Sequence, residues 1–122
     1  MPITYSIDSE SRWLIVIATD LITYTEIVAH LEQERDDGLL TNFELIDGRE
    51  ARLNLTPDEV RRIVELLRQL GRKSALGPTA VLVNGEYSYG MMRMLEILVE
   101  DVCDVRPFRD RREAEAWLQS IE

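Results

Sequence analysis

The stretch from residue 79 to residue 101 constrains the fold most, because it places a buried strand directly before an apolar helix. Residues 79–83 (TAVLV) are apolar and rich in β-branched side chains, which is typical of a strand covered on both faces. Turn residues flank this strand, with Gly77-Pro78 before it and Asn84-Gly85 after it. A strand followed at once by a helix predicts a parallel sheet whose strands are joined by helical crossovers.

The helix after this strand begins at Tyr87 or Ser88, of which Ser88 is the better N-cap residue. Its apolar side chains cover an arc of roughly 220°, whereas a helix lying on a sheet needs a stripe of about 100°. The arc consists of Met91, Met92, Met94, Leu95, Ile97, Leu98, Val99 and Val102. Either the helix is wedged between the sheet and another helix, or part of it contacts a partner or ligand, for which adaptable methionines are suited.

Strands and helices alternate along the rest of the chain. We expect strands at four further places, residues 3–7, 12–19, 42–47 and 102–108. Helices begin after three more capping residues, Thr23, Thr56 and Asp110. Residues 48–55 are expected to be an irregular connection. The order β-β-α-β-α-β-α-β-α predicts a single α/β domain over residues 1–122, with four helices and a mixed, mostly parallel five-stranded sheet opened by an antiparallel hairpin.

The two faces of this sheet are expected to be covered unequally. If strands adjacent in sequence are also neighbours in space, right-handed crossovers place three helices on one face. Residues 13–18 and 80–83 nevertheless carry apolar side chains at successive positions, so both faces require burial. Either the last helix lies on the second face, or another subunit or an apolar ligand covers it.

Composition excludes several classes of protein. A net charge of −9 and a pI near 4.6, without a basic cluster, disfavour binding to nucleic acid or anionic membranes. The single cysteine, Cys103, excludes an intramolecular disulfide and a cysteine-based metal site. No apolar run reaches the ~18 residues of a membrane span, and the first residues do not resemble a signal peptide. We therefore expect a cytoplasmic protein.

Residues suited to catalysis are few. His30 is the only histidine and lies off the apolar stripe of its helix, so we expect a solvated side chain. Cys103 is expected to be a buried, unreactive thiol. Nucleophile-elbow, dinucleotide-binding and P-loop spacings do not occur in the sequence. No catalytic residue, cofactor or metal site is predicted.

One group of polar residues follows the strands. Ligands of parallel sheets bind beyond the carboxyl ends of the strands. Those ends carry Asp47, Gly48, Arg49, Asn84, Gly85, Tyr87 and Tyr89. Arg49 and Arg52 would hold an anion with the backbone amides after Thr56. The alternative is a hydrogen-bonded loop in which Arg49 pairs with Glu50 or Glu86. The candidate contacts to a partner or ligand also include Met91, Met92 and Arg93.

Several segments resemble the SpoIIAA-like family, small bacterial STAS-type domains named after anti-sigma factor antagonists. They are DLITYTEI, LIDGRE, AVLVN, YSYGMMRMLEILVED and VRPFRDRREAEAWL. The likeness runs over nearly the whole chain and is most telling from Tyr89 to Glu96 and from Phe108 to Leu118. It implies a βα superhelix and a non-enzymatic role. The wider fold group includes CRAL-TRIO lipid-transfer domains, which hold lipid against the sheet.

The resemblance fails at the residue on which antagonists depend. Anti-sigma antagonists carry Asp-Ser-Ser-Gly after the third strand, with a phosphorylated serine, whereas this chain reads Asp47-Gly48-Arg49-Glu50. Thr56 is the nearest hydroxyl, and its place before Pro57 and Glu59 is explained by capping. We therefore expect no phosphoswitch of the antagonist type.

Two functions remain. The first is a non-enzymatic regulatory or binding module that acts through the helix after Asn84-Gly85 and the adjacent strand ends, as a homodimer or with a regulatory protein partner. The alternative is a carrier of a small apolar or lipid-like ligand between sheet and helices.

Overall fold

The structure is a computed structural model that describes residues 2–122 and contains one sheet with four helices. The strands are β1 (Ile3–Ile7), β2 (Leu14–Thr23), β3 (Glu44–Asn54), β4 (Thr79–Leu82) and β5 (Val105–Phe108). The helices are α1 (Tyr24–Asp36), α2 (Pro57–Gly71), α3 (Glu86–Leu98) and α4 (Arg111–Ile121). The strands lie in the order β1-β2-β3-β4-β5, with β1 antiparallel to β2 and all other pairs parallel. The predicted element order and mixed sheet are confirmed.

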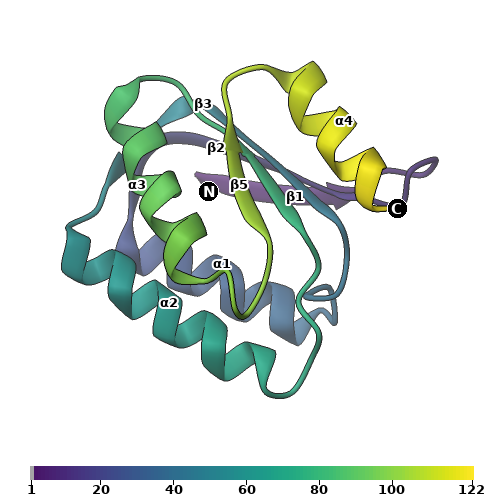
Figure 1. Ribbon diagram of the computed structural model, residues 1–122, viewed down its shortest axis with the longest axis horizontal. Coiled ribbons are helices and arrows are strands. Elements are labelled where there is room, and N and C mark those ends of the chain that lie inside the picture. The colour runs from purple at the N-terminus through teal and green to yellow at the C-terminus, as the bar shows by residue number, and fades with distance from the viewer. Residues whose placement is uncertain (1) are drawn as a thin grey trace.

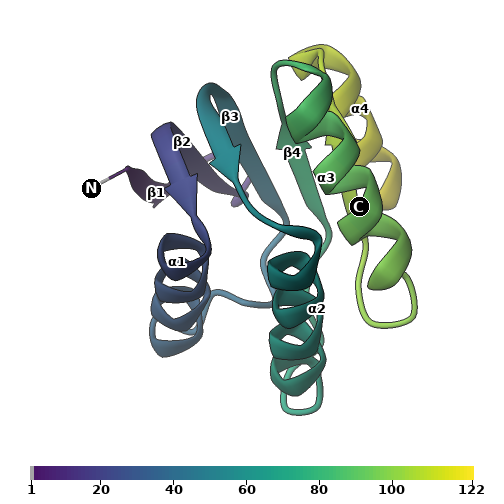
Figure 2. The ribbon, with the colours of Figure 1, turned by 90° about the vertical axis from the view of Figure 1, so that its left-hand side faces the viewer.

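The helices form two unequal layers. Helices α1 and α2 lie side by side on one face of the sheet, and α4 lies on the other (Figures 1 and 2). The side chains of β4 alternate between the layers: Val81 packs with α2 and α3, whereas Ala80 and Leu82 pack with α4. The apolar run of β4 is therefore explained by burial on both faces, and the last helix is what covers the second face.

Helix α4 covers only part of that face. Its fully buried Ala114 and Leu118 pack against Leu45, Ala80 and Leu82. Toward the β1 edge, the β2 side chains on the α4 face of the sheet remain in contact with solvent. Ile17 is 52% exposed and Leu21 is 44% exposed.

Strand β3 differs from its prediction. The segment after Asp47 was expected to be irregular, but the strand continues to Asn54 in register with β2. A bulge interrupts the pairing, because two residues of β3, Gly48 and Arg49, lie opposite Ala18 alone. A Cβ atom at Gly48 would lie 3.1 Å from the carbonyl oxygen of Leu82 in β4, so glycine permits this close approach.

Helix starts agree with their capping residues except in α3. The Thr56 amide donates to Glu59 Oε1 at 2.9 Å and the Glu59 amide donates to Thr56 Oγ1 at 3.1 Å, a complete capping box. The prediction of Ser88 as N-cap of α3 is wrong: the helix begins at Glu86 after Gly85, whose φ of 88° suits glycine. Ser88 is instead buried in the first turns of the helix.

Strand β5 also starts later than expected, at Val105. None of the helices within residues 2–122 combines the length and the apolar composition that crossing a membrane requires.

Candidate functional site

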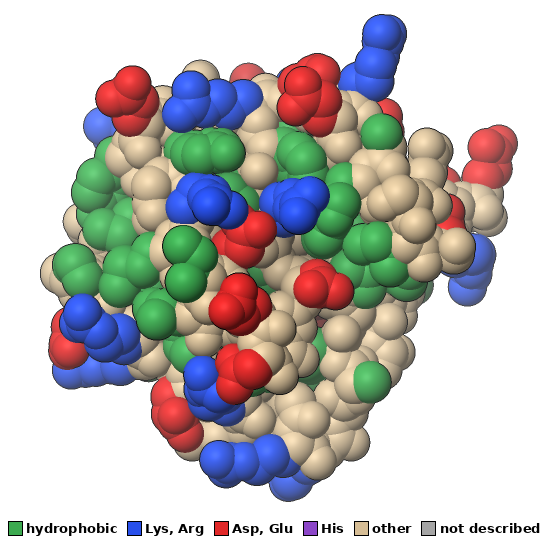
Figure 3. Space-filling model, in the orientation of Figure 1, with side chains coloured by type: hydrophobic (Ala, Val, Ile, Leu, Met, Phe, Trp, Pro, Cys, Tyr) green, Lys and Arg blue, Asp and Glu red, His purple; other side chains and the backbone are tan. Residues whose placement is uncertain are grey.

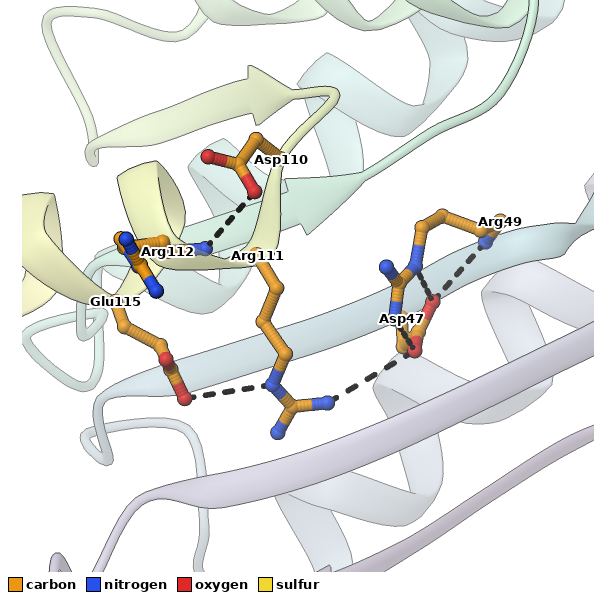
Figure 4. Close-up of polar contacts among 6 residues, drawn as sticks. All are labelled: Asp47, Arg49, Asp110, Arg111, Arg112 and Glu115. Carbon is orange, nitrogen blue, oxygen red and sulfur yellow. Dashed lines mark hydrogen bonds and ion pairs between the residues drawn. The ribbon is translucent and has the colours of Figure 1, made fainter.

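The structure brings Asp47 and Arg49 together as an ion pair. Arg49 donates from Nε to Asp47 Oδ1 at 3.0 Å and from Nη2 to Oδ2 at 2.8 Å (Figure 4). Arg111 of α4 lies 3.9 Å from the same carboxylate and also pairs with Glu115. The hydrogen bonds from Arg49 hold the pKa of Asp47 below its usual range. Arg49 therefore pairs with Asp47 and not with Glu50 or Glu86, and its charge is already balanced.

The other residues of the predicted polar group occupy separate places. Arg52 and Asn84 share a shallow depression with Arg49, which also contains the acidic Asp20 and Glu50. Thr56 caps α2, as its hydrogen bond from Glu59 shows.

The aromatic candidates at the start of α3 have partners within the chain. The Tyr87 hydroxyl donates to the Leu55 carbonyl, while the residue as a whole is 55% exposed. Arg109 lies over the Tyr89 ring at 4.5 Å, and Arg93 pairs with Glu96. The predicted site is thus divided among several local contacts.

Met91 and Met92 have a different surrounding, because both line an apolar cavity between the sheet and helices α1, α2 and α3. The cavity has a volume of about 160 Å³, is partly open to solvent, and has almost entirely apolar walls. The sheet contributes small residues to it, Ala18, Gly48 and Ala51.

The packing of α1 explains why this space is left. The apolar residues of α1, among them Tyr24, Ile27 and Leu31, are only partly buried, although they face the core. Small side chains on the sheet and a loosely packed helix above them leave a volume that neighbouring side chains do not fill.

Three polar side chains, His30, Glu34 and Glu44, form a cluster on the wall of the cavity. His30 Nε2 lies 2.6 Å from Glu34 Oε1 and 3.4 Å from Glu44 Oε2. Glu34 is 2% and Glu44 7% exposed. The Thr79 hydroxyl donates to the other Glu44 oxygen at 3.3 Å, and the Tyr5 ring packs edge-on against the imidazole.

The burial of this cluster shifts its titration. Burial lowers the pKa of His30, but the contacts with Glu34 and Glu44 outweigh this effect and raise the pKa above its ordinary value. Burial raises the pKa of Glu34 against the opposing effect of His30. Burial and the short contact between Glu34 and the imidazole therefore act in opposite directions on the charge of each group.

This cluster corrects the expectation of a solvated His30, whose side chain is only 9% exposed. Tyr5 from β1 and Glu44 from β3 cover it, and neither is near His30 in sequence. The spacing of His30 and Glu34, four residues apart on one helix face, was a signal in the sequence that could have found half of the cluster.

Cys103 is partly buried, and burial raises the pKa of its thiol to about 11. Cys103 is thus less buried than expected, and its low reactivity stays a prediction that rests on the small share of the nucleophilic thiolate at neutral pH.

Comparison with solved structures finds a similar chain. A protein of the DUF3478 family from Shewanella loihica PV-4, described as uncharacterized and as having a SpoIIAA-like fold, shares 22% sequence identity. The alignment covers 95% of this chain and 93% of that one, with a TM-score of 0.61. No protein-family model matches the sequence, and a search of curated proteins finds no match. The likeness over nearly the whole chain shows that this protein has a SpoIIAA-like fold.

Proposed function

We propose that the protein is a cytoplasmic, non-enzymatic binding module that takes up a small apolar molecule in the cavity between the sheet and helices α1, α2 and α3. The observation that carries the proposal is the cavity of about 160 Å³ with apolar walls. An engineered cavity of about 150 Å³ in another protein holds benzene. A single ring or a short branched chain therefore fits, and the open side lets a longer chain extend outward.

The energetic cost of the cavity supports a ligand. At ~24 cal/mol per Å³, an empty enclosed cavity of this volume would cost about 4 kcal/mol. Because this cavity is partly open, that figure is an upper value. A ligand that fills the space regains contacts with Met91, Met92 and the β2–β4 side chains that line it. Methionine suits such a wall because its side chain adapts to ligands of different shape.

A regulatory role through α3 is the second candidate. Met91 and Met92 line the cavity, while Ile97 of the same helix is 55% exposed. Hydrophobic side chains gather over α3 on the face that Figure 3 shows. A homodimer or a regulatory protein would cover Ile97. In the homodimer, Ile97→Arg would lower the mass measured by light scattering. A mass equal to that of one chain for the unmodified protein would count against the homodimer.

The ligand proposal is tested by filling the cavity. Toluene is titrated into ¹⁵N-labelled protein, and amide shifts are followed by NMR. We expect saturable shifts in the unmodified protein and a loss of at least tenfold in affinity for Ala18→Leu, whose side chain would occupy the space. Ala116→Leu is the matched control, because Ala116 is exposed on α4 and should leave binding unchanged. Native mass spectrometry of freshly purified protein then identifies any apolar molecule that co-purifies with it. Absence of saturable shifts, or equal binding by Ala18→Leu, would refute the proposal.

A further inference from the structure

The His30, Glu34 and Glu44 cluster places two carboxylates against one imidazole in the interior of the protein. Both glutamates are nearly inaccessible to solvent. Among the ion pairs of residues 2–122, His30 is the sole cationic partner of either carboxylate. Burying charged groups is costly unless they are paired and hydrogen-bonded. The cluster therefore has one fewer positive charge than two ionised carboxylates require.

Glu34 provides the strongest evidence that the cluster binds a group from outside the chain. Within the described residues, its Oε1 atom is buried and accepts no hydrogen bond. Its ion-pair contact is with His30 Nε2 at 2.6 Å, and the same nitrogen lies 3.4 Å from Glu44 Oε2. A single ring nitrogen thus faces two buried carboxylates, and a cation between the three side chains would satisfy the oxygen that is left without a hydrogen bond.

We propose that His30, Glu34 and Glu44 bind a divalent transition-metal ion, for which Zn²⁺ is the best fit. One ligand atom from each residue lies within 4.8 Å of the other two. Zinc bonds of about 2.0–2.2 Å place two tetrahedral ligands about 3.4 Å apart. The separation of His30 Nε2 and Glu44 Oε2 is already 3.4 Å, and the 2.6 Å separation from Glu34 has to widen by less than 1 Å.

The charge and the ligand types favour zinc over harder cations. Two carboxylates and a neutral imidazole carry a charge of −2, which a divalent ion balances in this enclosed place. Imidazole is a ligand for zinc, copper, iron and nickel, whereas Mg²⁺ and Ca²⁺ are usually held by six or more oxygen atoms, several of them from water. A three-ligand set of this kind leaves a fourth position for water or for a polar atom of another molecule.

The surrounding residues hold the ligands in place. His30 and Glu34 lie one turn apart on α1, which fixes their spacing. Thr79 of β4 donates to Glu44 Oε1 and leaves Oε2 directed at His30. Such outer partners orient ligating carboxylates, and their loss typically weakens metal binding 10–100-fold. Thr79 is thus a positioning residue of the proposed site.

The test uses the metal alone, so it does not depend on uptake of an apolar molecule. Metal-stripped full-length protein is titrated with Co²⁺, which reports coordination by its visible absorption, and Zn²⁺ affinity is obtained by competition. We expect one equivalent to bind, with a loss on the order of 100-fold for Glu34→Gln and His30→Gln and of about tenfold for Thr79→Val. Glu32→Gln is the matched control, because Glu32 is exposed on the same helix and should bind Co²⁺ like the unmodified protein.

Two results would overturn the proposal. The first is the lack of saturable Co²⁺ and Zn²⁺ binding by folded, metal-stripped protein, which would leave a buried network that only exchanges protons. The second is binding of equal affinity in Glu34→Gln, His30→Gln and the unmodified protein, which would place the metal elsewhere. Circular dichroism establishes that each variant is folded, and Glu44→Gln replaces any variant that is not.

Discussion

Replacing Ala18 by leucine tests whether the cavity is empty, because the substitution should raise the free energy of unfolding only if there is space for the larger side chain. Ala18 is a buried residue of β2 and lines the cavity between the sheet and α1–α3. Leucine adds three carbon atoms, and each buried CH₂ contributes about 0.8 kcal/mol, or about 2.4 kcal/mol in all. Part of that gain is lost to the ordering of the side chain. We therefore expect Ala18→Leu to stabilise the protein by about 1–2 kcal/mol.

The matched control makes the same change on the other face of the sheet. Ala80 of β4 is fully buried in the close-packed cluster beneath α4. Ala80→Leu therefore has no space to enter and should destabilise the protein by about 1–3 kcal/mol through overpacking. If leucine stabilises the protein at position 18 and destabilises it at position 80, the unfilled volume lies on the face of the sheet that α1, α2 and α3 cover.

Urea unfolding followed by tryptophan fluorescence measures both changes. The midpoint should rise for Ala18→Leu and fall for Ala80→Leu, with the dependence of the unfolding free energy on urea unchanged. If Ala18→Leu is destabilised as much as Ala80→Leu, the space beside Ala18 is already filled, and the cavity on which the ligand proposal depends does not exist in solution.

Three further predictions concern α4, α2 and the cysteine. Leu118→Ala should cost about 2–5 kcal/mol by urea unfolding, because Leu118 is fully buried between α4 and the sheet; a cost below 1 kcal/mol would mean that α4 does not close this face. Thr56→Ala should cost about 1 kcal/mol by loss of the cap on α2, while Thr56→Ser should be nearly neutral; equal losses would contradict capping. Alkylation of Cys103 by iodoacetamide should rise about tenfold per pH unit from pH 8 to pH 10, because burial raises the thiol pKa to about 11 and the thiolate fraction grows until that pH. A rate that levels off near pH 9 would show an unperturbed thiol.

Much of the architecture could be predicted because its signals are local. The capping boxes at Thr23 and Thr56 predicted two helix starts, and the apolar runs predicted the strands. Both kinds of signal involve residues only a few positions apart in the sequence. The extension of β3 was missed because residues 50–54 are polar on alternate positions and lack the apolar run of a central strand. Its period of two was nevertheless visible, with Ala51 and Leu53 turned toward the core.

The site was harder to predict because it depends on register and on volume. Glu44 reaches His30 only because β3 pairs with β2 at Leu14, a pairing that no local pattern specifies. A cavity is a difference between the space enclosed by the elements and the volume of their side chains, and neither can be obtained from the residues of a single element. Asp47 and Arg49 were expected at the end of the third strand, but β3 continues past them to Asn54, and the ion pair between them spans the bulge at Gly48.

The wide apolar arc of α3 was expected either to be wedged between the sheet and another helix or to contact a partner or ligand, and the structure explains part of it from within the chain. Met91 and Met92 lie on the inner side of α3, where they border the cavity, and α4 covers the second sheet face. A helix with excess apolar surface can reduce its contact with water either by binding another chain or by enclosing space with its neighbours. The loosely packed α1 and the small residues of β2 and β3 favour the second solution, in which part of the apolar arc borders the cavity. Ile97 remains exposed, so a homodimer through α3 stays a prediction that light scattering can test.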